Sequence, residues 1–361
     1  MNRLLAVLAV TFFCGIASGT EPPVKAGPAY PGKTWEKIEN PGELGWSPPG
    51  LDDLREQLKR THAESMVVVY EGHVLFEYGD VAKPMFLASV RKSLLAIMYG
   101  NYVANGTIKL DATLADLKID DVGGLSAREK QATVQDLLRA RSGVYHPAAN
   151  KGDDSAQAPP RDSREHGTYF LYNNWDFNAL GTIFEQQTGQ NIYDAFDRDY
   201  AQPMQMQDFQ RAEQKKEHHD NLSIHPAYHF RVSARDLARV GLLMLHEGNW
   251  EGKQLAPRDW VKEISRLATP VSDMHPEALL KGPLGYGYLW WVWDPRWGKG
   301  PYEGAYTGRG YNGQFVTVMP ALNVVVAFET PQGAGNRTSL EQYLKILDAL
   351  VGAKCREAPC K

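Results

Sequence analysis

The strand-prone segments of this chain lie near its two ends, and this distribution constrains the fold more than any other feature. Near the start, Ser65–Tyr70 and His73–Tyr78 are rich in Val and aromatic residues and flank a Glu-Gly turn, which is typical of a β-hairpin. Near the end, Gly287–Trp293, Gly313–Met319 and Asn323–Phe328 are also β-prone. Since the sequence between these ends is mostly helical or looped, we predict an α+β fold with one sheet and an inserted, mainly helical lobe.

Periodicity and capping residues place the helices. Leu51–Thr61 repeats Leu at helical spacing, and Trp175–Thr188 carries an apolar stripe. Thr133 and Ser233 are hydroxyl residues ahead of apolar sequence, as expected of N-caps. Further helices are expected over residues 89–104 and 340–351.

The first residues have the pattern of an export signal. A positive start, an apolar stretch and small residues follow one another between Met1 and Gly19. We therefore expect a cleaved signal peptide over residues 1–19, an irregular lead-in over 20–49, and a periplasmic or secreted bacterial protein. Cysteine use agrees, because Cys355 and Cys360 in the short tail 355–361 can close a small disulfide loop in an oxidising compartment.

Charge and hydropathy exclude some classes of partner. The 361 residues carry a formal net charge of −4, so no basic excess is available to bind a nucleic acid. The apolar run Leu4–Ile16 is too short to span a membrane comfortably. We expect neither nucleic-acid binding nor stable membrane insertion, and the sequence leaves the oligomeric state open.

Ser89-Val90-Arg91-Lys92 places a hydroxyl and an amine one helical turn apart at the start of an apolar helix. Residues three apart share a helix face, so the Lys92 amine is expected to reach the Ser89 hydroxyl. A helix N-terminus also offers unpaired N–H groups to a developing oxyanion. These are the requirements of an activated serine nucleophile. Taken alone, however, Ser-x-x-Lys is a weak signal, because it is far more often the solvated start of an ordinary helix.

Tyr172-Asn173-Asn174 comes directly before the predicted helix that begins at Trp175. A phenol beside a lysine ammonium loses its proton more easily, so Tyr172 is expected to take the serine proton and later deliver it to the leaving group. The Asn174 amide is expected to hold the lysine amine or a substrate carbonyl. The alternative is a loop tyrosine followed by an Asn helix cap.

A third candidate motif, Tyr306-Thr307-Gly308-Arg309, leads into the strand that ends near Pro320. A Thr-Gly pair at a strand start lets a substrate approach the backbone closely, and the next N–H can act as a second oxyanion donor. The alternative is a plain turn, because several further glycines crowd the same region.

In this order and at these separations, the three motifs resemble those of the penicilloyl-serine hydrolase superfamily, in its branch of class C β-lactamases, DD-peptidases and related esterases and amidases. That superfamily carries Ser-x-x-Lys, then Tyr-x-Asn, then Lys-Thr-Gly or His-Thr-Gly on a strand near the C-terminus. Flanking segments are also similar, at residues 106–111, 137–143 and 316–320. The resemblance implies a β-lactamase/transpeptidase-like fold over residues 50–354. Its antiparallel sheet, flanked by helices, would occupy about 50–88 and 285–354, with the helical lobe over about 89–284.

The resemblance also implies residue roles. Ser89 would be the acylated nucleophile, Lys92 and Tyr172 would share the general-base work, and Asn174 would bind substrate. The backbone N–H groups of Ser89 and Arg309 would form the oxyanion hole, with no metal and no cofactor. The implied activity is hydrolysis of an ester or amide bond in a small molecule through an acyl-enzyme. The alternatives are a β-lactamase or DD-peptidase, and a catalytically slow binding or sensor module on the same fold.

One departure from the superfamily bears on the substrate. Tyr306 stands where a β-lactamase of this type carries the lysine that attracts the substrate carboxylate. Other esters and amides are therefore expected to be better substrates than β-lactams or D-Ala-D-Ala peptides, although Arg309 can replace the charge. The Gly-rich segment from Gly308 to Gln314, where the strand begins, resembles the corresponding segment of the family's esterases and aminohexanoate-oligomer hydrolases. The register of the third motif is therefore open by one or two positions.

Other conspicuous features receive structural interpretations. Glu217–Asp220, with His225 and His229, is interpreted as a solvated loop rather than a zinc site. His146 has no expected carboxylate partner and is a poor rival base. The polar loop Ala148–Gly167 is a candidate lid. A tryptophan cluster is assigned to strand packing, with some rings available to line a substrate pocket: Trp290, Trp291, Trp293 and Trp297.

Overall fold

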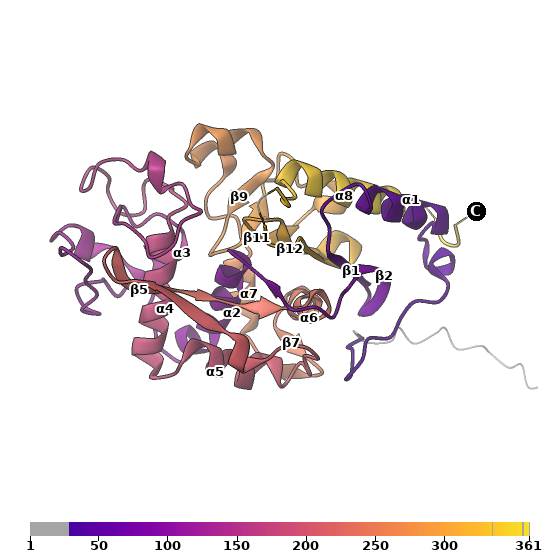
Figure 1. The fold of residues 1–361 in the computed structure, drawn as a ribbon, viewed down its shortest axis with the longest axis horizontal. Helices are drawn as coiled ribbons and strands as arrows, with labels where there is room; N and C mark the ends of the chain where they lie inside the picture. The colour runs from indigo at the N-terminus through magenta and orange to yellow at the C-terminus, as the bar shows by residue number, and fades with distance from the viewer. Residues whose placement is uncertain (1–28, 334, 356, 361) are drawn as a thin grey trace, which may run out of the picture.

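A seven-stranded antiparallel sheet built from both ends of the chain lies at the centre of the molecule, with strand order β2-β1-β13-β12-β11-β10-β9 (Figure 1). The computed structural model describes residues 29–333, 335–355 and 357–360, so the predicted signal peptide lies outside the described residues. The strands are β1 (Ser65–Tyr70), β2 (His73–Gly79), β9 (Leu284–Tyr286), β10 (Trp291–Trp293), β11 (Tyr306–Gly310), β12 (Gln314–Met319) and β13 (Val324–Glu329). The pairing of β1 with β13 joins the two ends and confirms the α+β class.

Helices cover both faces of this sheet. On one face, α8 (Leu340–Gly352) stacks Tyr343 on Phe315 of β12 with 3.8 Å between ring centroids, and α1 (Pro48–Leu58) lies beside α8 (Figure 1). On the other face, α2 (Val90–Ala104) and α6 (Ala234–Leu245) pack against the strands. Successive strand residues point to opposite faces, so this arrangement leaves β12 and β13 buried on both sides.

The lobe between β2 and β9 holds shorter elements. Its helices are α3 (Val134–Leu138), α4 (Asn174–Thr188), α5 (Ile192–Phe196) and α7 (Arg258–Ile264). Three two-stranded sheets pair β3 (Met85–Phe86) with β6 (Arg231–Val232), β4 (Lys215–His219) with β5 (Ser223–His229), and β7 (Asn249–Trp250) with β8 (Lys253–Gln254). The caps predicted at Thr133 and Ser233 are present, since each hydroxyl accepts a hydrogen bond from the main-chain N–H three residues on.

Two local predictions are wrong. The β-prone run Gly287–Trp293 is a strand only in its second half, because Gly287 to Trp290 form the turn that joins β9 to β10. Leu289 adopts φ +60° there, and a Cβ on Gly287 would lie 2.4 Å from the carbonyl oxygen of Ile264. The second is Glu217–Asp220, which is not an irregular loop, because Glu217 lies in β4 and pairs with Ala227 of β5.

The tight contact between α6 and the sheet gives a stability prediction. A Cβ at Gly241 of α6 would lie 2.3 Å from Cγ1 of Val325, a buried β-branched side chain with no room to turn away. Gly241→Ala should therefore lower the free energy of unfolding by about 1–3 kcal/mol, as overpacked cores do. Urea denaturation measures this change. The matched control is Gly352→Ala at the end of α8, where a Cβ meets nothing within 4 Å, and we expect a change of under about 0.5 kcal/mol there.

Two further facts concern the periphery of the described chain. Cys355 and Cys360 form a disulfide, as the sequence allowed. In the part of the chain that the structure describes, every helix is too short or too polar to cross a membrane.

Candidate active site

Ser89 stands at the N-terminus of α2, on a turn that holds it in a fixed position. Ala88 adopts φ +47°, a conformation that is costly for a residue with a Cβ and is common where a backbone presents a functional side chain. Leu87, on the other side of this turn, is tied down by a hydrogen bond from its N–H to the carbonyl of Phe230. The buried apolar positions of α2 then anchor the helix that carries both Ser89 and Lys92.

The Lys92 amine connects the first two predicted motifs. Its Nζ lies 2.9 Å from Ser89 Oγ, 2.7 Å from Tyr172 Oη and 2.7 Å from Asn174 Oδ1. The side chain is 1% exposed, and none of its three hydrogen-bond partners is an anion. Burial, reinforced by the Arg91 charge, holds the pKa of Lys92 well below its usual range. A neutral amine in this position can accept the proton of Ser89.

The pKa of Tyr172 is shifted in the direction opposite to the one expected. It is packed among the rings of Phe177, Tyr286 and Trp291, and this burial raises its pKa to about 12. The sequence predicted an easily ionised phenol because a lysine ammonium was expected beside it. Desolvation outweighs nearby positive charge here, so Tyr172 is a protonated phenol near neutral pH. The geometry therefore favours Lys92 as the base and Tyr172 as a proton donor.

A segment of the candidate lid loop closes over these residues. Asp153 accepts a hydrogen bond from the main-chain N–H of Asn174 (2.7 Å), and the Asp154 N–H donates to the Tyr172 carbonyl (2.9 Å). The Asn174 amide donates to the Lys151 carbonyl (3.2 Å). Burial raises the pKa of Asp154 to about 6. These bonds fix the loop to the Tyr-Asn-Asn motif, and sequence reasoning missed both aspartates because a polar loop gives no signal of its own.

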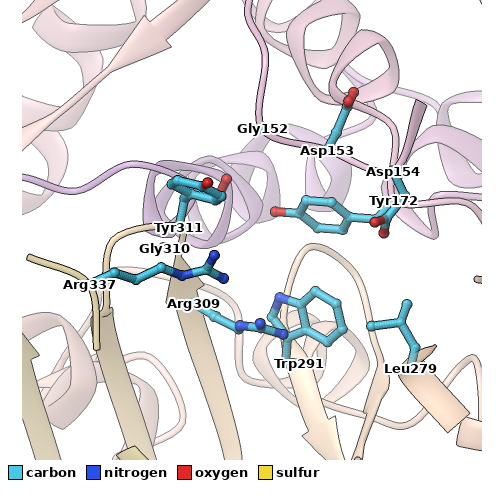
Figure 2. Close-up of a pocket in the computed structure, with 11 residues that line it drawn as sticks. Gly152, Asp153, Asp154, Tyr172, Leu279, Trp291, Arg309, Gly310, Tyr311 and Arg337 are labelled. Carbon is cyan, nitrogen blue, oxygen red and sulfur yellow. The ribbon is translucent and has the colours of Figure 1, made fainter. Parts of the chain in front are cut away.

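Ser89 lies where two cavities meet. The first, of about 200 Å³, has Tyr172 pointing into it above Trp291 and Arg309, as Figure 2 shows. The second, of about 380 Å³, is lined partly by Phe86, Glu217 and His229. Because the Ser89 side chain borders both spaces, a ligand at Ser89 has room on either side of it. The first cavity is lined by Ser89, Gly152, Asp153, Asp154, Tyr172, Leu279, Trp291, Arg309, Gly310, Tyr311 and Arg337.

The third predicted motif reaches this cavity only at its last residue. Tyr306 packs edge-on against Trp290, with 5.4 Å between ring centroids. Thr307 Oγ1 lies 2.9 Å from Thr317 Oγ1, and a Cβ on Gly308 would lie 2.9 Å from Ser93 Oγ. These three positions alternate between the two faces of the sheet, and core residues cover both faces there, so they do not line the cavity. Arg309, Gly310 and Tyr311 line it instead.

Two arginines in the first cavity have no counter-ion. Arg309 lies over the ring of Trp291 (5.2 Å to the centroid), and Arg337 lies over Tyr311 (4.5 Å). Among the described residues, neither guanidinium forms a hydrogen bond or an ion pair with a side chain. Aromatic stacking holds both cations in place and leaves their N–H groups available to a ligand.

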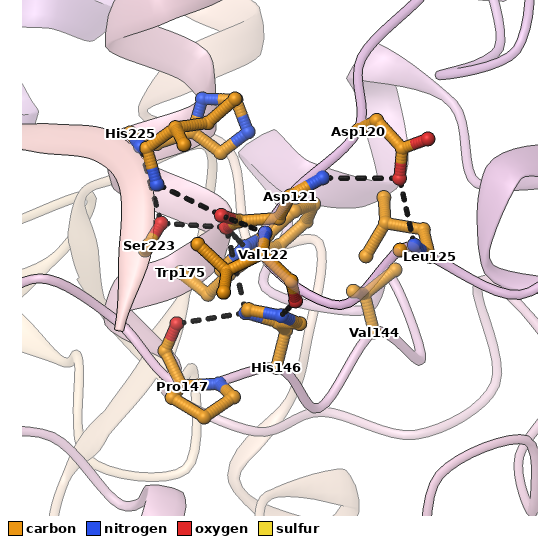
Figure 3. Close-up of polar contacts among 12 residues, drawn as sticks. Asp120, Asp121, Val122, Leu125, Val144, His146, Pro147, Trp175, Ser223 and His225 are labelled. Atoms are coloured by element: carbon orange, nitrogen blue, oxygen red, sulfur yellow. Dashed lines mark hydrogen bonds and ion pairs between the residues drawn. The ribbon is translucent and has the colours of Figure 1, made fainter. Parts of the chain in front are cut away.

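His146 is not a rival base, although it does have a carboxylate neighbour. Its Nδ1 lies 3.4 Å from Asp121, and its Nε2 lies 2.8 Å from the Val122 carbonyl (Figure 3). Asp121 also accepts hydrogen bonds from Trp175 and Ser223, and this buried cluster does not line either cavity beside Ser89. Within the described ranges, no group of three or more His, Cys, Asp or Glu residues is arranged to hold a metal ion.

A family model and a curated relative match parts of this chain. A model of the Beta-lactamase family matches residues 55–350. An uncharacterized protein of Alkalihalophilus pseudofirmus is 31% identical over 114 residues, which cover 28% of this chain and 32%, about a third, of that relative.

Solved structures share the fold at low sequence identity. A penicillin-binding protein homologue from Caulobacter crescentus is 17% identical with a TM-score of 0.62, over 86% of this chain and 99% of that one. A beta-lactamase from Mycobacterium bovis is 19% identical with a TM-score of 0.58, over 83% and 99% of the two chains. At these identities the likeness is one of fold.

Proposed function

Because this chain belongs to the beta-lactamase family, we propose that it is a serine hydrolase that cleaves an ester or amide bond through a covalent acyl-enzyme on Ser89. The observation that carries the proposal is that the Lys92 amine contacts both Ser89 and Tyr172. This amine is buried, and among the described residues none of its hydrogen-bond partners is an anion. The substrate is a small molecule, because the cavities beside Ser89 measure about 200 and 380 Å³. The predicted signal peptide and the Cys355–Cys360 disulfide support a periplasmic or secreted location.

Acylation begins with the transfer of the Ser89 proton to the neutral Lys92 amine. The serine oxygen attacks the substrate carbonyl, and the developing oxyanion is stabilised by the N–H of Ser89 and by a main-chain N–H of β11. β11 pairs with β10 only as far as Thr307, which lies opposite Trp291. Among the described residues, the edge of β11 that faces β10 is therefore unpaired from Gly308 onward. This free edge supports Arg309 as the second donor.

The leaving group needs a proton in order to depart, and the position of the Tyr172 phenol supports its role as the donor of that proton. Its Oη lies 2.7 Å from Lys92 Nζ, so the proton taken from Ser89 can pass through the amine to replace the one that the phenol gives away. Water then attacks the acyl-enzyme from the same side, with the proton path reversed. Asn174, held by Lys92 and the Lys151 carbonyl, keeps the amine aimed at Ser89.

A turnover screen tests the proposal. Purified protein would be assayed with short-chain p-nitrophenyl esters, amide oligomers, D-amino peptides and a chromogenic cephalosporin. Steady turnover of an ester or an amide supports it. A burst of one equivalent of product with no steady state would instead indicate a slow binding or sensor module on the same fold.

A β-lactamase or DD-peptidase is the second candidate, and the unpaired cations favour it. Such enzymes bind a substrate carboxylate through a positive side chain beside the nucleophile. Arg309 and Arg337 both line the cavity, and among the described residues neither forms an ion pair with a carboxylate, although Asp153 and Asp154 line the same cavity. Cephalosporin hydrolysis as fast as ester hydrolysis in the screen would make this candidate the better one.

The arginines give a prediction that applies to either candidate. We expect Arg309→Met to lower kcat/KM about 10- to 100-fold for a p-nitrophenyl ester whose acyl chain ends in a carboxylate, because a charge-assisted hydrogen bond is lost. The matching methyl-capped ester should change under about 3-fold. Arg266→Met is the control for total charge, since Arg266 pairs with Glu263 and lines neither cavity beside Ser89. Equal loss on both esters would show that Arg309 does not recognise an anion.

A further inference from the structure

Arg91, the residue before Lys92 on α2, is a buried cation without a counter-ion. Its side chain is 1% exposed and lies over the Tyr228 ring, 4.3 Å from the centroid. Nη2 donates to Asn178 Oδ1 (2.7 Å), and Nη1 is buried with no hydrogen-bond partner. Among the described residues, no carboxylate lies within ion-pair distance of Arg91. Burying a charge in this way costs stability, so its presence calls for an explanation.

The position of Arg91 directly before Lys92 suggests an explanation for this buried charge. Lys92 is equally buried, and its own partners Ser89, Tyr172 and Asn174 are uncharged. A proton on Lys92 would place a second buried cation on the neighbouring residue of the same helix, and among the described residues no anion is hydrogen-bonded to either. A lysine becomes a good base when it is desolvated or lies beside another cation, because both effects disfavour the charged amine.

We propose that Arg91 is a positioning residue for the catalytic base: its fixed charge, held by Asn178 and Tyr228, keeps Lys92 unprotonated so that the amine can accept the Ser89 proton. The inference rests on the proposed function, since it assigns a task only if Lys92 acts as a base. Asn178 is suited to hold the guanidinium because it supplies a neutral acceptor, whereas an aspartate there would cancel the charge. Asn178 is itself fixed by a hydrogen bond to Asn150 Oδ1 (2.9 Å).

Other charges act on the same region, and they balance against Arg91. The carboxylates of Asp153 and Asp154 raise the pKa of Lys92, but burial and Arg91 outweigh them. On the β4–β5 side, burial, reinforced by the Arg91 charge, lowers the pKa of His229 to about 4, so that ring stays neutral and adds no positive charge near neutral pH. The charged and titratable groups around the pair are Lys151, Asp153, Asp154, Tyr172, Tyr193, Glu217, Tyr228, His229 and Arg309.

The test measures how the rate of fluorophosphonate labelling depends on pH, which requires no knowledge of the substrate. In the wild type, the rate should rise with pH as the Lys92 amine loses its proton. Arg91→Met should move the midpoint of this rise to a pH that is higher by about one to two units. At pH values below the midpoint, labelling of the variant should therefore be about 10- to 100-fold slower than that of the wild type. Arg91→Lys should shift the rise in the same direction, because a lysine as buried as Arg91 would itself lose its charge.

A second pair of variants covers the case in which Arg91→Met does not fold. Asn178→Asp places a carboxylate on Arg91 and should also shift the rise upward, whereas Asn178→Ala leaves the charge in place and should not shift it. An unshifted rise in both Arg91→Met and Asn178→Asp overturns the inference while the proposed function stands. If the wild type is not labelled at Ser89 at any pH, the proposed function fails and the inference fails with it.

Discussion

Replacing Ser89 with alanine should abolish covalent labelling by a fluorophosphonate and lower the turnover of any substrate by about 10⁴-fold or more, the loss typical of a removed nucleophile. The expected loss is this large because the other groups at the site act through the serine. Lys92 has no proton to take without Ser89, and Tyr172 has no leaving group to protonate. Gel fluorescence of the labelled protein and intact-mass spectrometry measure the first effect, and the turnover assay measures the second.

The matched control for this variant is Ser93→Ala. Ser93 lies one turn further along α2 and is also buried, but its hydroxyl donates to the Leu289 carbonyl (2.8 Å) and not to Lys92. This variant should lose about 1 kcal/mol of stability and keep its labelling. If the Ser89→Ala protein is still labelled, the acyl-enzyme mechanism is wrong, whatever Ser93 does.

The parts of the site that the sequence predicted are those governed by local geometry. Ser89 and Lys92 are three residues apart on one helix, so their contact follows from the helical repeat. The resemblance to a family then supplied Tyr172 and Asn174, which lie 80 and 82 residues away from Lys92. The fold was predictable for a similar reason, because hairpins and caps carry short-range signals.

The parts that were missed depend on burial and register. The low acidity of the Tyr172 phenol comes from Phe177, Tyr286 and Trp291, and no sequence spacing states that these rings meet around one hydroxyl. The sequence left the register of the third motif open, and that register decides which of its side chains reach the site. Its glycines fit several registers, and the packing of Tyr306 on Trp290, with Arg309 at the cavity, follows only from the fold.

Removing the Tyr172 hydroxyl should reveal which proton transfer limits the reaction. Tyr172→Phe is expected to slow the hydrolysis of an alkyl ester or an amide by about 10²- to 10⁴-fold, the range for loss of a general acid. The kcat/KM of a p-nitrophenyl ester, which reports acylation alone, should fall under about 10-fold, because its leaving group departs as a stable anion and needs no proton. The contrast follows from the pKa of Tyr172, which burial raises to about 12 and which keeps the phenol protonated near neutral pH.

Tyr286→Phe separates this effect from a loss of packing. The Tyr286 ring packs against Tyr172 with 6.0 Å between centroids and is equally buried, and its hydroxyl makes no contact with Lys92. That variant should therefore slow both substrates by the same small factor. If Tyr172→Phe slows the p-nitrophenyl ester as strongly as the amide, the phenol acts before the leaving group departs. The base would then be the tyrosine rather than Lys92, and the pH dependence of labelling would follow the phenol instead of the amine.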